Sequence, residues 1–311
     1  MHLPTLASLA ILASSALAQS TTQLFNFTTY VDIENSILRP NGHLLLTTFN
    51  NGSLYTLDPT VAKPKAELVA VFPGVTAISG IAAIGANTFA VVGGIRGHYH
   101  YTNETVFTVD FDNEKDETKP TIKAVTQVPE AVMFNGLASL PTRPDVVFVA
   151  DSRRGCLFQV DTKTGNSKIA FQHPALFAPA NASIPIGING LKIANGNVFF
   201  TNSARNIFAR IPISENGDIV NDVKVIARLN SNDGSDWDDF AIDASGVAYV
   251  AQPHNALARI TPDGKQVIVA GGGNSTALHG PTSVNIAKDG KTAYVTTQGG
   301  QVVRVELPGY Q

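Results

Sequence analysis

A short motif recurs along the chain and constrains its fold more than any other feature. Phe134-Asn135-Gly136-Leu137 returns most plainly as Ile188-Asn189-Gly190-Leu191, and an apolar–polar–small–apolar pattern of this kind, called a rung below, occurs six times. The polar members of the rungs, which stand 44 to 56 residues apart, are Glu34, Ser79, Asn135, Asn189, Asp238 and Thr282. A repeat of roughly 40 to 50 residues built from short strands is typical of a β-propeller.

The residues between the rungs support an all-β fold. Each rung leads into runs rich in β-branched and aromatic residues, separated by turn signals such as Asn195-Gly196. We therefore predict a single six-bladed β-propeller over residues 19–311. The last blade is one strand short, because the chain ends soon after Val302–Leu307. The alternating stretch Thr21–Tyr30 is predicted to supply that strand and close the ring, which removes two exposed sheet edges.

Composition excludes several classes of partner. The 311 residues carry a net charge of -3 and contain no basic run, so neither nucleic acid nor an anionic membrane surface is expected as a partner. No segment after the first 18 residues is apolar enough to span a membrane. The sequence contains no Gly-x-Ser-x-Gly elbow, no His-Glu-x-x-His and no phosphate-binding glycine loop, which argues against the enzyme classes that use them, and no organic cofactor is expected. Small-molecule substrates remain, and nothing in the sequence indicates an oligomeric state.

The N-terminus and several asparagines predict secretion. Residues 1–18 form an apolar run that ends in Ala16-Leu17-Ala18, the pattern of a signal peptide cleaved before Gln19. Five Asn-x-Ser/Thr sequons are predicted glycosylation sites: Asn26, Asn51, Asn103, Asn181 and Asn274. Cys156 is the only cysteine, so the chain forms no internal disulfide, and we expect a buried structural thiol.

Propeller topology predicts where a binding site lies. The rungs begin the innermost strands, which converge on one mouth of the central channel, and the turns between second and third strands surround the same mouth. Those turns contain candidate donors and polar contacts: Arg96, His98, Tyr99, His100, Tyr101, Arg153, Asn202, Gln252 and Gln298. We expect a site at this mouth.

Four rung residues form a candidate metal site. Glu34, Asn135, Asn189 and Asp238 bring two carboxylates and two amide oxygens around one axis, a set suited to one divalent ion such as Ca²⁺, Mg²⁺, Mn²⁺ or Zn²⁺. The alternative is that these side chains cap the channel and bond to one another and to water. The ligand in the fifth rung is either Asp238 or its neighbour Asp239.

The rungs, together with the run from Ala241 to Val250, resemble the senescence-marker-protein/gluconolactonase family of six-bladed propellers. That family binds one divalent ion at the channel mouth, and the resemblance carries its ligands to Glu34, Asn135, Asn189 and Asp238. In its lactonases the ion polarises the substrate carbonyl and activates water, with the carried-over Asp238 as proton shuttle. The chain departs from the family's Gly-Glu-x-Pro start, which reads Ile33-Glu34-Asn35-Ser36 here.

A narrower resemblance points to a different reaction. The leader, the sequons and the two Asn-Gly rungs resemble a group of secreted fungal propellers that includes hetero-Diels-Alderases of tropolonic sesquiterpenoid biosynthesis. Those enzymes join a quinone methide to a humulene-type polyene. Such a cycloaddition needs a dry pocket with hydrogen-bond donors. The candidate donors are Arg96, His98, His100 and Arg153, and the candidate walls are Phe134 and Trp237.

Three functions follow from these residues. The first is a hetero-Diels-Alderase-type cyclase, the second is a metal-dependent lactonase, and the third is a non-catalytic secreted binding propeller. Each candidate residue also has a structural explanation: Arg153 as part of a solvated turn, His98 and His100 as surface residues, and Trp237 as core. The three functions differ in their response to chelation and to loss of the arginines.

Overall fold

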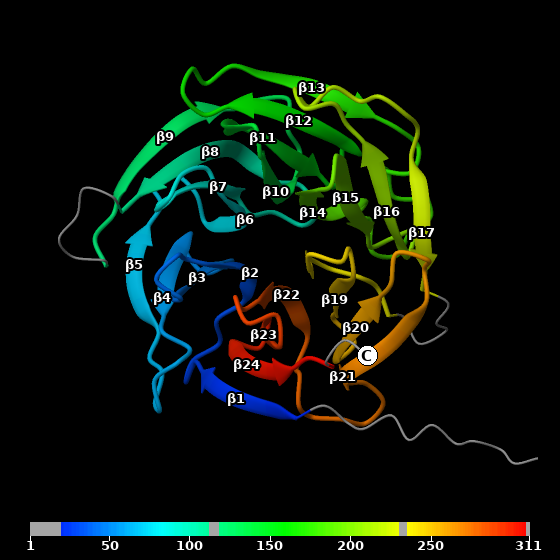
Figure 1. Cartoon of the computed structure of the whole chain (residues 1–311). Helices are drawn as coiled ribbons and strands as arrows, with labels where there is room; N and C mark the ends of the chain where they lie inside the picture. The colour runs from blue at the N-terminus through cyan, green and yellow to red at the C-terminus, as the bar shows by residue number, and fades with distance from the viewer. Residues whose placement is uncertain (1–19, 112–117, 230–234, 309–311) are drawn as a thin grey trace, which may run out of the picture.

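The computed structural model describes residues 20–111, 118–229 and 235–308. Within these ranges the secondary structure consists of strands and turns, with no helix, and therefore no helix that could span a membrane. The predicted signal peptide at 1–18 lies outside the described residues. The strands form six four-stranded antiparallel sheets arranged in a ring (Figure 1), so the predicted six-bladed β-propeller is confirmed.

Six blades follow one another along the chain. Blade 1 contains β2 (Ile33–Leu38), β3 (Leu44–Thr48), β4 (Ser53–Leu57) and β5 (Glu67–Val71); blade 2 contains β6 (Ala77–Ala83), β7 (Thr88–Ile95), β8 (Thr102–Asp110) and β9 (Thr121–Gln127); blade 3 contains β10 (Phe134–Leu140), β11 (Arg143–Asp151), β12 (Cys156–Asp161) and β13 (Ser167–Gln172). Blade 4 contains β14 (Ile188–Ala194), β15 (Asn197–Asn202), β16 (Ile207–Pro212) and β17 (Lys224–Arg228); blade 5 contains β18 (Phe240–Ile242), β19 (Ala248–Gln252), β20 (Ala256–Ile260) and β21 (Gln266–Gly271); blade 6 contains β22 (Pro281–Ile286), β23 (Thr292–Thr297), β24 (Gln301–Glu306) and β1 (Thr21–Asn26).

The N-terminal strand closes the ring. β1 pairs antiparallel with β24, with Thr21 opposite Val305 and Asn26 opposite Gln301. In Figure 1 the blue β1 lies along the red β24, at the outer edge of blade 6. The first and last strands of the described chain therefore share one sheet, as predicted from the missing strand of the last blade.

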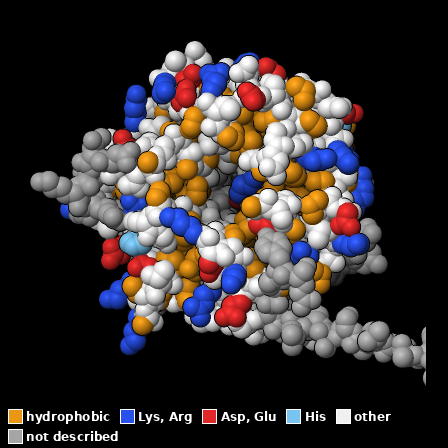
Figure 2. Space-filling model, viewed as in Figure 1, with side chains coloured by type: hydrophobic (Ala, Val, Ile, Leu, Met, Phe, Trp, Pro, Cys, Tyr) orange, Lys and Arg blue, Asp and Glu red, His pale blue; other side chains and the backbone are white. Residues whose placement is uncertain are grey.

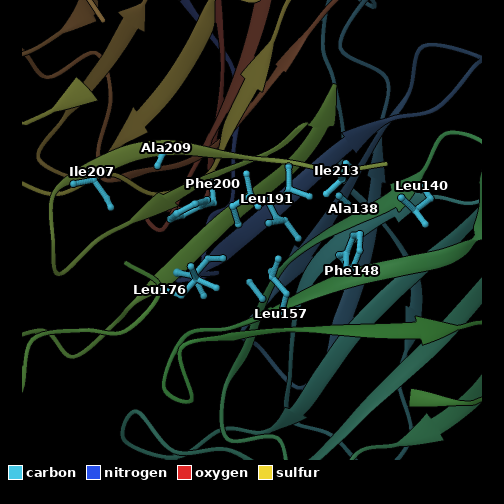
Figure 3. Packing of buried hydrophobic residues seen from close by; sticks show 14 of the residues in the cluster. Ala138, Leu140, Phe148, Leu157, Leu176, Leu191, Phe200, Ile207, Ala209 and Ile213 are labelled. Carbon is cyan, nitrogen blue, oxygen red and sulfur yellow. The ribbon is translucent and has the colours of Figure 1, made fainter. Parts of the chain in front are cut away.

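Apolar side chains fill the interfaces between blades. The buried hydrophobic residues form six clusters, and each cluster draws on two neighbouring blades. Figure 3 shows the cluster between blades 3 and 4, where Phe148 and Leu157 face Leu191 and Phe200. Cys156 is fully buried between blades 2 and 3, where burial raises the pKa of its thiol to about 12. The burial expected of this cysteine is confirmed.

Hydroxyl groups link neighbouring blades at their inner strands. Thr47 Oγ1, on the second strand of blade 1, donates to the Ser79 carbonyl on the inner strand of blade 2 at 2.6 Å. Ser79 Oγ donates to the Phe134 carbonyl on the inner strand of blade 3 at 3.0 Å. Thr282 Oγ1 of blade 6 donates to the Ile33 carbonyl of blade 1 at 2.7 Å, across the closure of the ring. These bonds fix each inner strand against the next, because carbonyls at the channel would otherwise lack a partner.

The rungs carry a glycine because neighbouring inner strands approach closely. A Cβ atom at Gly136 would collide with the Asn189 carbonyl, and one at Gly190 would stand 2.6 Å from Asp239 Oδ1. Only glycine allows this approach. The Asn-Gly rungs thus have a packing origin as well as a place at the channel.

Candidate functional site

A cavity of about 550 Å³ lies at the mouth of the channel where the inner strands begin. All six blades contribute to it, as do the loops between them. Its lining residues are Asp32, Glu34, Phe49, Arg96, Gly97, His98, Tyr99, Tyr101, Met133, Asn135, Ile184, Ile186, Asn189, Asp236, Asp238, Pro253, His254, Thr282 and Gln298. The ring is also hollowed at its centre in the space-filling view of Figure 2, where hydrophobic side chains surround the hollow.

β-Bulges bring the rung side chains into this cavity. The pairing of inner strand with second strand shifts between Ile33 and Asn35, between Phe134 and Leu137, and between Ile188 and Leu191. Glu34, Asn135 and Asn189 lie within these shifts. A bulge leaves residues unpaired and redirects their side chains, which places them at the channel and not between the blades.

The structure brings together all four predicted metal ligands. Glu34, Asn135, Asn189 and Asp238 line the same cavity. It also separates Asp238 from Asp239: the Asp239 carboxylate is buried and accepts two hydrogen bonds from Lys192 Nζ, at 2.6 and 2.7 Å. Because the Asp239 carboxylate is paired with Lys192 and does not line the cavity, Asp238 is the residue available there.

Asn189 supplies a test of whether a cation fits. Its Nδ2 donates to Ser203 Oγ at 2.9 Å, while in the described part of the chain its buried Oδ1 has no hydrogen-bond partner. A buried amide oxygen without a partner is costly unless something binds it. The four oxygen-bearing side chains therefore suit a hard divalent cation. Among residues 20–111, 118–229 and 235–308, no group of three or more His, Cys, Asp or Glu side chains could hold a metal ion without other ligands. A metal site in this cavity would therefore need the amide oxygens of Asn135 and Asn189.

Carboxyl groups dominate the electrostatics of the cavity. Burial, reinforced by the neighbouring Asp32, raises the pKa of Glu34 to about 8. Burial and the charge of Glu34 raise the pKa of Asp238 well above its ordinary value. Burial also raises the pKa of Asp32 and of Asp236. Four carboxyls crowded at one mouth repel one another, so the site favours protons or a bound cation.

Arg96 is the cation of the cavity wall. Its Nη1 atom lies 3.3 Å from Asp32 Oδ2, and its guanidinium stands 4.0 Å above the ring of Phe49. The backbone N–H of Arg96 donates to Thr76 Oγ1 at 2.9 Å. An arginine held by a carboxylate and an aromatic face has its remaining N–H groups in fixed directions.

Blade 2 supplies most of the remaining predicted contacts. His98, Tyr99 and Tyr101 line the cavity with Arg96, and Gln298 joins them from blade 6. Tyr99 has a φ of 53°, a left-handed conformation that is unusual for a tyrosine. Burial raises the pKa of Tyr101 above its ordinary value, so its hydroxyl stays protonated.

Two predicted wall residues belong to the core instead. Phe134 is 1% exposed and packs edge-on against Phe158, between blades 2 and 3. Trp237 is fully buried between blades 4 and 5. The apolar positions of a rung point away from the channel because side chains alternate along a strand, so neither lines the cavity.

Four further predicted residues also lie off the cavity lining. His100 is exposed, and Gln252 is buried and is not among the residues that line the cavity. Asn202 Nδ2 donates to the carbonyls of Ala175 and Phe177, and Arg153 Nη1 donates to the carbonyl of Pro185. Asn202 and Arg153 therefore bond the loop at 173–187 and do not face the channel.

The cavity contains residues that the sequence reasoning missed. They are Asp32, Phe49, Met133, Ile184, Ile186 and Asp236. The turn residues Gly97, Pro253 and His254 and the rung residue Thr282, which the sequence places at the mouth, also line the cavity. A signal existed for three of the missed residues: Asp32, Met133 and Asp236 each precede a predicted ligand by two positions. These three residues lie in the segments that lead into the inner strands β2, β10 and β18, so they accompany Glu34, Asn135 and Asp238 to the mouth.

Sequence comparisons agree with the narrower resemblance. No protein-family profile matches the chain. The chain is 29% identical over 294 residues to a protein of Phoma sp named "Putative hetero-Diels-Alderase", covering 85% of this chain and 82% of that protein. It is 26% identical over 305 residues to a protein of Sarocladium schorii named "Putative hetero-Diels-Alderase asR5", covering 88% of this chain and 76% of that protein. The expected resemblance is confirmed. Both matches cover more than four fifths of this chain.

Solved structures agree on the fold. A luciferin-regenerating enzyme superposes with a TM-score of 0.67 at 14% identity, covering 94% of this chain and 96% of that chain. A calcium-binding protein, regucalcin, from Agrobacterium tumefaciens superposes with a TM-score of 0.64 at 13% identity, covering 93% and 96%. Virginiamycin B lyase from Staphylococcus aureus gives 0.59 at 11% identity, covering 93% and 99%. At these identities the likeness establishes the propeller alone.

Proposed function

We propose that this protein is a cyclase that catalyses a hetero-Diels-Alder cycloaddition between a quinone-methide partner and a humulene-type polyene, a coupling of the tropolonic sesquiterpenoid class. The observation that carries the proposal is the similarity of this chain to two proteins named as putative hetero-Diels-Alderases, over more than four fifths of the chain. The cavity supports it, because donors and apolar surface line the same space.

The reaction makes modest chemical demands. The oxygen and exocyclic carbon of the quinone methide add across one C=C bond of the polyene, so that one C–O and one C–C bond form. No group leaves, and no proton or electron is exchanged with the protein. The protein contributes by holding two partners at reacting distance and by donating hydrogen bonds to the quinone-methide oxygen, which becomes more negative in the transition state.

Arg96 is the donor best placed for this role. It lines the cavity, and Asp32 and Phe49 fix its guanidinium, as the 3.3 Å and 4.0 Å separations show. A pre-positioned cationic donor needs no reorganisation as charge develops on the substrate oxygen. Tyr101 and His98 lie on the same wall and offer further hydrogen bonds.

The test compares wild type with Arg96→Met in a coupling assay that supplies a polyene and a quinone methide generated in solution. Removal of one such donor is expected to lower kcat/KM by about 100-fold. Arg304→Met is the matched control, since Arg304 is an exposed arginine of β24 far from the mouth. Equal coupling rates with and without wild-type protein would overturn the proposal.

A metal-dependent lactonase is the second candidate, and Asn189 favours it. The unpartnered Oδ1 of Asn189 shares the cavity with Glu34, Asn135 and Asp238. These four residues would hold one divalent ion, with Ca²⁺, Mg²⁺, Mn²⁺ and Zn²⁺ as candidates. When bound, such an ion supplies Lewis-acid polarisation of a carbonyl. Asp238 would orient the attacking water and accept its proton.

Metal content distinguishes the two candidates. Dialysed protein that keeps about one divalent ion per chain, and loses it in Asp238→Ala but not in Asp263→Ala, would support the site; Asp263 is an exposed control. Lactone hydrolysis that disappears on chelation would then favour the second candidate. Turnover of neither substrate class would leave a non-catalytic binding propeller as the function.

We also propose that the protein is secreted and glycosylated. Asn26, Asn51, Asn181 and Asn274 are exposed, which suits carriage of a glycan. Asn103 is half-buried, and its Nδ2 donates to the Gly74 carbonyl at 2.6 Å. Mass spectrometry of the secreted mature chain would test cleavage before Gln19 together with the occupancy of each sequon.

A further inference from the structure

The segment at 173–187, called the 173–187 loop below, connects blade 3 to blade 4 and reaches over the cavity. Its residue Leu176 is fully buried and packs into the hydrophobic cluster between the two blades, beside Leu157 and Phe200 (Figure 3). Ile184 and Ile186, near its other end, line the cavity. One apolar residue therefore anchors the loop in the core while two others face the site.

Hydrogen bonds fix the loop on both sides. Asn202 Nδ2 donates to the Ala175 carbonyl at 2.8 Å, and Arg205 Nε donates to the Phe177 carbonyl at 2.7 Å. Near the end of the loop that lines the cavity, Arg153 Nη1 donates to the Pro185 carbonyl at 3.0 Å and the Ala204 N–H donates to the Ile186 carbonyl at 2.8 Å. Since Pro185 stands between Ile184 and Ile186, the bond from Arg153 holds both side chains in place.

Three apolar residues of the cavity lining lie on one side of the ring, at blades 3 and 4. Asp32 and Glu34 come from blade 1, which lies across the channel from blade 4, whereas Asp236 and Asp238 lead into blade 5, next to blade 4. The side of blades 3 and 4 presents Met133, Ile184 and Ile186 to the cavity, beside the amides of the two Asn-Gly rungs.

We infer that Ile184 and Ile186, with Met133, form a pre-organised wall that selects a hydrocarbon partner, and that Arg153 is a positioning residue for this wall. The inference rests on the proposed cycloaddition and assigns the polyene to the side of blades 3 and 4. The quinone methide then occupies the side of Arg96 and Asp32, at blades 1 and 2. A rigid apolar wall binds a flexible polyene more tightly than a mobile wall does, because fewer protein side chains have to be ordered on binding.

The test uses N-phenyl-1-naphthylamine, a neutral fluorophore whose emission rises in apolar surroundings, titrated into the full protein. Wild type is expected to bind one probe per chain. Ile184→Asn should raise the Kd about 10-fold, because a polar side chain, which loses water when the probe binds, replaces an apolar contact. Ile184→Val keeps the wall apolar and should bind as wild type does. Ile268→Asn is the matched control, since Ile268 is exposed on the outer strand β21.

Arg153 is tested with the same probe and with the coupling assay. Arg153→Ala is expected to weaken probe binding and to raise the KM for the polyene at nearly unchanged kcat, and Arg153→Lys should restore both, since lysine can still donate to Pro185. Ile184 is exposed enough for its variants to fold, and a thermal unfolding midpoint verifies this.

Two results would overturn the inference: wild type that binds no probe, or Ile184→Asn that binds it as tightly as wild type. The outcome of this binding test can be distinguished from the outcome of the coupling assay that tests the proposed reaction. Probe binding that responds to Ile184→Asn in a protein without coupling activity would support the wall and contradict the cycloaddition. Coupling activity with a polyene KM unaffected by Ile184→Asn would support the cycloaddition and contradict the wall.

Discussion

A buried ionisable residue, Glu104, lies beside the site and fixes the start of an inner strand. Glu104 is 2% exposed, accepts a hydrogen bond from the Phe134 N–H at 2.6 Å and has a second oxygen without a partner in the described residues. Burial raises its pKa to about 8. It therefore holds the start of β10, where Asn135 enters the cavity, as a protonated acid near neutral pH.

This raised pKa predicts how stability depends on pH. Between the ordinary value of 4.5 and about 8, the folded state keeps a proton on Glu104 that the unfolded chain releases. The free energy of unfolding should therefore fall as pH rises through this window, by up to about 1.4 kcal/mol per pH unit for one such group. Glu104→Gln keeps the acceptor oxygen and should flatten the slope. Denaturant unfolding at pH 5, 6, 7 and 8 measures it, and an unchanged slope would contradict the assignment.

The ion pair between Lys192 and Asp239 leads to a second prediction at this scale. The side chain of Asp239 is 2% exposed and that of Lys192 is 32% exposed. Lys192→Met leaves a buried carboxylate unpaired, which should cost about 3–5 kcal/mol of stability. Lys192→Met combined with Asp239→Asn should recover part of that loss. A double variant no more stable than Lys192→Met would show that the pair is not coupled.

At the scale of strands, the rungs explain what the sequence predicts well and where it fails. Their spacing predicts the six inner strands, and the Asn-Gly pairs predict residues at the mouth. Asn195 and Gly196, with φ of 49° and 67°, form the predicted tight turn. The bulges at the rungs and the burial of Phe134 depend on contacts between blades, so local patterns do not reveal them.

The long loops limit sequence prediction most. Ile184 and Ile186 reach the cavity because Leu176 anchors their loop in the core. Three side chains from other parts of the chain also bind carbonyls of this loop: Arg153, Asn202 and Arg205. Periodic patterns in the sequence do not reveal contacts between residues that are far apart along the chain. For the same reason Arg153 and Asn202, predicted at the site from their turns, bond the loop instead.

The glycine of a rung gives a prediction for a whole strand. Gly136→Ala places a methyl group against the Asn189 carbonyl and the N–H of Leu191 on β14. Overpacking of this kind should cost about 1–3 kcal/mol and separate β10 from β14. Gly290→Ala, in a turn with open space around it, should cost less although its φ of 66° is left-handed. Equal losses in the two variants would contradict the close approach of the strands.

Closure of the ring governs the whole molecule. Removal of β1 would expose β24 along its full length and leave blade 6 with three strands. A chain lacking residues 19–29 should unfold at a lower temperature and aggregate at lower concentration, because an open strand edge pairs with other molecules. Light scattering during a thermal ramp measures both effects, and a truncated chain as stable and soluble as the intact one would contradict the role of the N-terminal strand.

The positions of Arg96 and of the apolar wall at the mouth lead to a claim about stereochemistry. If Arg96 fixes the quinone-methide oxygen on one side and Ile184 with Ile186 seats the polyene on the other, only one face of each partner meets the other. The most direct measurement is the enantiomeric excess of the coupled product, formed with wild-type protein and without protein. The account predicts a strong excess with protein, reduced in Arg96→Met, and a racemic product in buffer alone. A racemic product in the presence of wild-type protein would contradict it.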